Sequence, residues 1–180
     1  MATINLPEYE TRIRDFCVSA LETFSRENPA TRVSTVVLYA FPNYGTLIFC
    51  LDTAANAAKH ADEGGRDENG LVLISVPYFA FFEWRRLDIE EWSDAYEVDQ
   101  EEEPLVIQTV DGGTVTMGEG EDDGDETLNE PVFGLLVKVM RDVTRQAAIR
   151  TLNREMVLGI GVEIEDSEFS EYWTFTGEPT

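Results

Sequence analysis

The chain has 180 residues, of which 43% are hydrophobic and 27% charged, and its formal net charge at pH 7 is −23. This hydrophobic content excludes a disordered chain, and the length predicts one domain with its own core over residues 1–180. A charge this negative opposes binding to nucleic acid phosphates and to anionic membranes, because both attract proteins through cationic side chains. We therefore expect no nucleic acid and no membrane among its partners.

Several features favour a cytoplasmic protein. The first ten residues lack the basic and apolar segments of a secretory signal, and no apolar run approaches the roughly 20 residues that span a bilayer. The two cysteines, Cys17 and Cys50, each lie within an apolar run. That placement is typical of buried free thiols in a reducing compartment.

The first third of the chain predicts a helix followed by a central hairpin. Residues 7–26 carry apolar side chains at helical spacing from Tyr9 to Phe24. Two apolar runs follow, residues 35–41 and 46–51, and their length and β-branched and aromatic content favour strands. Because neither run alternates with polar residues, both faces should be covered, which places this hairpin at the centre of a sheet.

The middle of the chain predicts short elements separated by turns. A short helix is expected over residues 54–61, an exposed loop over 62–70, and one or two strands within 71–84, with Pro77 marking an edge or a break. Residues 88–96 predict a short helix capped by Asp88. A second hairpin is expected from strands 105–110 and 114–117, because Asp111 and Gly112 favour a tight turn.

The last third combines an acidic loop with a long helix. Residues 118–126 contain six acids and predict a flexible loop, and residues 130–154 predict a helix. A final strand is expected over 156–165, with Tyr172, Trp173 and Phe175 anchoring an acidic tail. The whole pattern predicts an α+β fold, with three or four helices on a mainly antiparallel sheet of five to seven strands.

No residue pattern indicates a catalytic, metal or cofactor site. The single histidine, His60, argues against histidine-dependent catalysis and against zinc, and no glycine-rich phosphate-binding pattern occurs. Residues 119–130 overlay a calcium-binding loop in part, but Glu119 stands where that loop starts with Asp and Glu126 where it is apolar. The sequence therefore favours binding over catalysis and names no catalytic residue, no metal ligand and no cofactor.

The strongest candidate for a partner-binding surface is an aromatic and acidic stretch over residues 83–103. Tryptophan and tyrosine carry much of the binding energy of interfaces when polar groups surround them, and carboxylates steer a basic partner. In the alternative, the indoles fill the core and the acids form a solvated surface. The candidate partner-binding residues are Trp84, Glu91, Trp92, Asp94, Tyr96, Glu97 and Asp99.

The segment TVVLYAFPNYGTLIFCLDTAANAAKH, with EWRRLDIEEW after it, resembles uncharacterised small acidic cytoplasmic bacterial proteins. In general character it is similar to immunity proteins that neutralise toxins. The resemblance implies binding without catalysis, with an acidic face covering a basic toxin. We therefore expect an acidic binding protein with a basic protein partner. A small metal-dependent hydrolase and a housekeeping domain whose acidity reflects salt adaptation are the alternatives.

Overall fold

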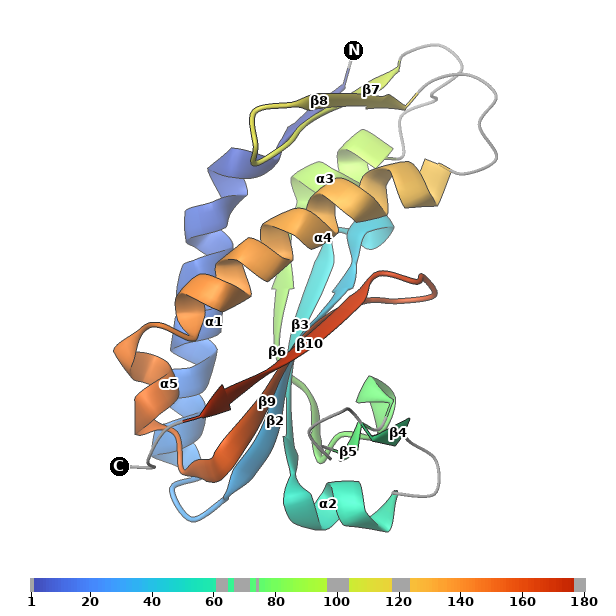
Figure 1. Cartoon of the computed structure of the whole chain (residues 1–180). Coiled ribbons are helices and arrows are strands. Elements are labelled where there is room, and N and C mark those ends of the chain that lie inside the picture. The colour runs from blue at the N-terminus through green and yellow to red at the C-terminus, as the bar shows by residue number, and fades with distance from the viewer. Residues whose placement is uncertain are drawn as a thin grey trace.

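The computed structural model describes residues 2–60, 65–66, 72–73, 75–96, 104–117 and 124–176. Within them the chain forms an α+β fold in which helices pack on sheets, as the sequence predicts. Figure 1 shows helices α1, α4 and α5 against one face of the central sheet and the short helix α2 beyond its lower edge, near β4 and β5.

The central sheet has five strands in the order β10-β9-β2-β3-β6. Strands β2 and β9 are parallel, and the other neighbours are antiparallel. Almost every residue of β2 and β3 is buried, which confirms that this hairpin lies at the centre of the sheet. The strands are β2 (Val33–Phe41), β3 (Thr46–Thr53), β6 (Phe81–Asp88), β9 (Arg154–Ile164) and β10 (Ser170–Thr176).

The second hairpin, β7 (Leu105–Gln108) and β8 (Thr114–Met117), does not extend the central sheet. It joins β1 (Thr3–Asn5), which pairs with β7 in parallel, to make a separate three-stranded sheet. Ile4, Ile107 and Met117 are buried in the main core, so this small sheet covers one end of it. A further short pair is β4 (Gly65–Arg66) and β5 (Val72–Leu73).

Four helices contribute to the larger core, namely α1 (Leu6–Glu27), α3 (Glu90–Tyr96), α4 (Gly124–Val143) and α5 (Ala147–Thr151). The opposite face of the sheet carries a smaller cluster that includes Val37, Tyr39 and Cys50. Beside it lie α2 (Ala54–Lys59) and the 3-10 turn η2 (Val76–Tyr78), while η1 (Pro42–Tyr44) joins β2 to β3. Cys17 and Cys50 are buried free thiols, as expected.

Three predicted boundaries are wrong. The long helix α4 begins at Gly124, inside the expected acidic loop, and ends at Val143, so Arg154 starts β9 instead of ending a helix. Residues 170–176 form the edge strand β10 instead of a tail. Helix α3 begins at Glu90, so the expected cap Asp88 is two residues away from it; Asp88 ends β6 and accepts a hydrogen bond from the Thr46 hydroxyl at 2.9 Å.

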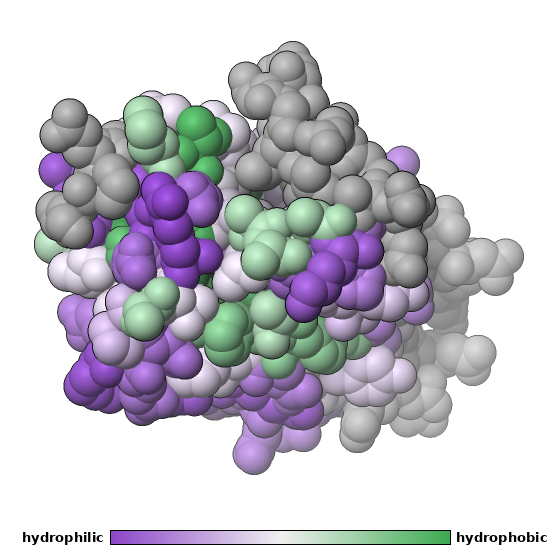
Figure 2. Space-filling view, turned by 90° about the horizontal axis from the view of Figure 1, so that it is seen from below, coloured by the Kyte–Doolittle hydropathy of each residue, from purple (hydrophilic) through white to green (hydrophobic). Residues whose placement is uncertain are grey.

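The lower end of the molecule is mixed in polarity. Seen from below, apolar side chains interrupt a largely hydrophilic surface (Figure 2). Among the described residues, the large apolar side chains with substantial exposure include Met156 and Val157 of β9 and Phe82 of β6. No helix in the described ranges is both long enough and apolar enough to cross a bilayer.

Candidate functional site

Carboxylates gather at one end of the central sheet, which we call the acidic end. Because β2, β6 and β9 run in the same direction, all three finish at this edge, next to η1, α3 and the β9–β10 turn. The start of α4 and the β7–β8 hairpin lie at the same end (Figure 1). The described acids here include Asp88, Glu90, Glu91, Asp94, Asp111, Glu130, Glu165, Asp166 and Glu168.

Cations gather at the opposite end, where α1 finishes and α5 lies (Figure 1). They are Arg26, Arg32, Lys59, Arg145, Arg150 and Arg154. Several of the acids there are paired: Arg26 lies 3.7 Å from Glu27, Arg32 lies 3.2 Å from Glu155, and Arg145 lies 3.6 Å from Asp142. Among the described residues, cations are therefore more numerous at this end than at the acidic end.

Arg12 and Arg86, the cations described at the acidic end, are both paired with carboxylates. Arg12 pairs with Glu91 at 3.5 Å, and Arg86 pairs with Asp88 at 2.7 Å and with Glu83 at 3.7 Å. The hydrogen bond from Arg86 lowers the pKa of the Asp88 carboxyl and keeps it ionised. These pairs leave a net excess of negative charge at this end.

The two candidate indoles pack inside the protein to different degrees. Trp92 of α3 is fully buried, with its ring edge-on to Tyr9 at 5.4 Å between centroids. Trp84 is half-buried, packs on Phe24 at 5.2 Å, and donates from Nε1 to the carbonyl oxygen of Ala20 at 3.3 Å. Trp92 therefore belongs to the core, and Trp84 packs against the core while remaining partly exposed.

The other candidate residues divide by position on α3. Glu91 and Asp94 are exposed, whereas Tyr96 is half-buried against the core. Trp92 and Ala95 define the buried side of the helix, so Glu90 and Asp94 share its outward side. Glu97 and Asp99 lie outside the described residues.

A turn and a helix are joined rigidly at this end. Gly45 closes η1 with φ of 61°, and its carbonyl oxygen accepts a hydrogen bond from the Ile89 amide at 2.7 Å. A β-carbon on Gly45 would lie 2.1 Å from the carbonyl oxygen of Ile89. Only glycine fits this contact, which fixes Tyr44 beside the start of α3.

Two adjoining hollows open on either side of this turn. One, of about 500 Å³, is lined by Thr46, Arg86 and Ser93 in addition to the shared residues. The other, of about 200 Å³, adds Asn129 of α4 and Asp166 of the β9–β10 turn. Phe41, Tyr44 and Glu165 line both, so an aromatic pair and a carboxylate form the wall between them.

A strip of tyrosines and carboxylates continues from these hollows along the sheet. Tyr172 lies over Gly161 and donates its hydroxyl hydrogen to Glu163, and Tyr39 stands edge-on to Phe41 at 5.3 Å. Burial raises the pKa of both tyrosines, and nearby carboxylates add to the effect. Both phenols therefore stay protonated at neutral pH.

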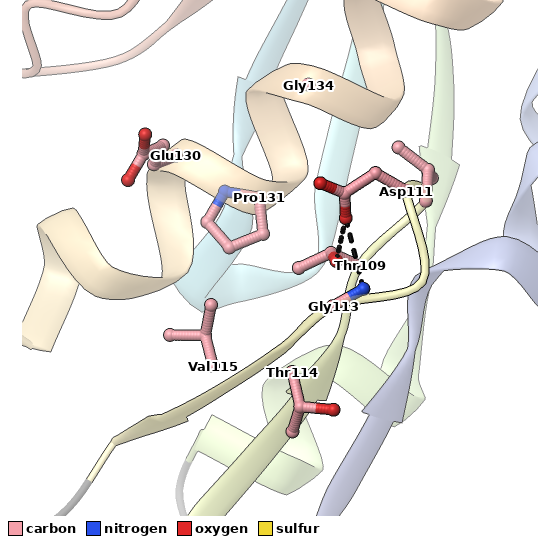
Figure 3. A pocket seen from close by; sticks show the side chains of 9 residues that line it. Thr109, Asp111, Gly113, Thr114, Val115, Glu130, Pro131 and Gly134 are labelled. Carbon is pink, nitrogen blue, oxygen red and sulfur yellow. Dashed lines mark hydrogen bonds between the residues drawn. The ribbon is translucent and has the colours of Figure 1, made fainter.

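A third hollow, of about 400 Å³, lies between the β7–β8 hairpin and α4. Pro131 and Val115 point toward one another across it, while Glu130 points away (Figure 3). Asp111 accepts hydrogen bonds from the Thr109 hydroxyl and the Gly113 amide, which lower its pKa. Its carboxylate holds the turn, so the two acids do not converge on a common ligand.

One buried carboxyl lies away from the acidic end. Asp52 is 1% exposed, and its Oδ1 accepts from Asn56 Nδ2 at 2.9 Å and from the Ala80 amide at 3.0 Å. Burial raises its pKa. The nearby His60 ring stacks on Tyr78 at 5.4 Å. These contacts join the end of β3 and α2 to η2 and to the residues just before β6.

In the part of the chain that the structure describes, no three or more His, Cys, Asp or Glu side chains cluster as ligands of one metal ion would. Of the partial calcium-loop overlay, Glu119, Glu121 and Asp123 lie outside the described residues. Gly124 and Glu130 lie in helix α4, a backbone that cannot wrap around an ion as a calcium loop does.

The sequence did not single out Tyr44, Glu165 or Asp166, which line these two hollows. Tyr44 stands in an ordinary turn pattern, and Glu165 and Asp166 look like solvated turn acids. Asp166 has φ of 52°, an uncommon value for a residue with a side chain. What could have drawn attention to Tyr44 is its place in a turn between two buried strands, where an aromatic ring is not needed for packing.

The chain matches no protein-family model, no curated protein and no solved structure.

Proposed function

We propose that this chain is an acidic binding protein that engages a basic protein partner through its acidic end. The observation that carries the proposal is the separation of charge, with unmatched acids at one end of the sheet and the larger group of cations at the other. A solubility coat would spread its acids evenly, whereas a concentrated field steers an oppositely charged partner and speeds encounter.

The partner class that fits best is a basic toxin, and the chain would then act as an immunity protein. Such a protein needs no catalytic group, because it acts by covering its partner's surface. The exposed carboxylates of α3, Glu90 and Asp94, are held on an outward helix face beside a rigid turn. Preformed surfaces of this kind bind with little ordering cost.

Affinity chromatography tests the proposal. The chain is immobilised and a lysate of the cells that encode it is applied at about 50 mM salt, where surface charges are weakly screened. We expect a basic protein to be retained and then released at about 500 mM salt, where screening is strong. Retention of no basic protein, or retention that salt does not weaken, would contradict the proposal.

A growth assay separates the toxin from other basic partners. If the retained protein is a toxin, its expression alone arrests growth and its co-expression with the chain restores growth. If the retained protein leaves growth unchanged, the immunity assignment is wrong while binding to a basic partner stands.

A further inference from the structure

Tyr44 has the highest exposed fraction, 69%, of the large hydrophobic residues that the structure describes. It stands on a turn that Gly45 and Ile89 hold in place, so its position is fixed without its ring taking part in the core. Tyrosine is one of the residue types that most often contribute large shares of the binding energy at protein interfaces.

The ring stands at a wall between two hollows that also expose carboxylates. Glu165 lines both hollows and Asp166 lines the smaller one. No cation among the described residues pairs with either carboxylate, whereas Arg86 in the wider hollow is already held by Asp88 and Glu83. Burial, and then repulsion by Asp166, raise the pKa of Glu165. A bound cation would relieve that repulsion.

We propose that these hollows accept an arginine side chain of the basic partner, with its guanidinium against Phe41 and Tyr44 and paired with Glu165. This inference rests on the proposed function and names how the partner is recognised. A guanidinium is planar, stacks on aromatic faces, binds carboxylates through two parallel hydrogen bonds, and is less strongly hydrated than an ammonium. Those properties match a site made of rings and carboxylates better than a lysine does.

Two matched pairs of variants test the site. Glu165→Gln removes the carboxylate that lines both hollows, and Glu168→Gln removes an exposed carboxylate of the same turn that lines neither. Tyr44→Ala removes the exposed ring at η1, and Tyr78→Ala removes another exposed tyrosine on η2. Each pair changes charge or ring content equally, so a difference within a pair reports on the hollow.

The probe is a capped octapeptide, (Gly-Arg)4, titrated by calorimetry or NMR at low salt. We expect Glu165→Gln and Tyr44→Ala each to raise its dissociation constant about fivefold, and the two control variants to raise it less than twofold. The lysine analogue should bind more weakly, and the uncharged citrulline analogue should not bind. Three outcomes would overturn the inference. The two variants of each pair could affect binding equally, the arginine and lysine peptides could bind equally, or (Gly-Arg)4 could fail to bind at millimolar concentration.

The same variants, applied to the retained partner, keep this inference separate from the proposed function. Suppose that substitutions on α3 weaken binding of the partner while Glu165→Gln weakens it no more than Glu168→Gln does. The arginine site is then wrong, and the acidic end still binds the partner. If neither set of substitutions weakens binding of the partner, the proposed function itself is wrong.

Discussion

Gly45 and Ile89 meet backbone to backbone: the Gly45 carbonyl oxygen accepts the Ile89 amide hydrogen at 2.7 Å, and a β-carbon on Gly45 would lie 2.1 Å from the Ile89 carbonyl oxygen. This contact joins the turn between the two central strands to the first residue before α3. It therefore sets the position of the exposed Tyr44 ring relative to the acids of α3.

Gly45→Ala should destabilise the fold by about 3 kcal/mol. Part of the cost is the left-handed backbone, about 1–2 kcal/mol for a residue with a β-carbon, and the rest is movement of Ile89 away from a 2.1 Å contact. Gly112→Ala is the control, because Gly112 also has positive φ, 88°, but open space around it. Urea denaturation measures both, and equal losses would show that the contact with Ile89 does not matter.

Asp52 should make stability depend on pH. Because burial raises its folded pKa above the unfolded value, the folded state holds the proton more tightly. The stability that this tighter proton binding adds to the folded state is fully present below about pH 4. It is lost as the pH rises through the pKa of Asp52 in the folded state. In Asp52→Asn this dependence disappears, so the variant should gain stability relative to the parent across that window. Thermal melts between pH 4 and 8 check this, and a constant difference would contradict it.

Removing the side chain of Asp52 tests its structural role separately. Asp52→Ala leaves the Ala80 amide without its acceptor and removes one of the two acceptors of the Asn56 side-chain amide, and it should cost about 2–3 kcal/mol. Asp52→Asn retains an acceptor oxygen and serves as the matched control. Equal unfolding free energies for the two variants would show that these hydrogen bonds contribute nothing.

Trp92 should affect stability and leave partner binding unchanged. Its ring is fully buried against Tyr9, and its Nε1 has no hydrogen-bond partner among the described residues. Trp92→Phe should lower the unfolding free energy by about 1–2 kcal/mol, and the dissociation constant of the basic partner should stay within twofold. Denaturation and calorimetry measure the two quantities. A large loss of affinity at unchanged stability would instead make Trp92 an interface anchor.

The sequence predicts the centre of this fold well, because a strand that is buried on both faces needs apolar residues at consecutive positions. Val36, Leu38 and Phe49 lie in runs with no polar alternation, and all three are fully buried in the central strands. The outer strands β1 and β10 lack such a run of apolar residues. Strand β1 has only three residues, and β10 mixes Glu171 with aromatic residues, so neither differs locally from a loop.

The candidate site was predictable in part. The exposed acids of α3 follow from local sequence, since Trp92 and Ala95 mark the buried side of the helix. The hollows at Tyr44 do not, because they require the β9–β10 turn to lie beside η1. That arrangement depends on the parallel pairing of β2 with β9, a contact between segments far apart in the chain that no local pattern encodes.

The most direct test of the acidic end compares two charge-matched variants against the retained basic partner. Glu90→Gln with Asp94→Asn removes two carboxylates from α3, and Asp15→Asn with Glu22→Gln removes two exposed carboxylates from α1. At low salt we predict that the α3 variant raises the dissociation constant about tenfold and that the α1 variant changes it less than twofold. Equal weakening by both variants would show that the charge acts as a uniform coat and would contradict the account.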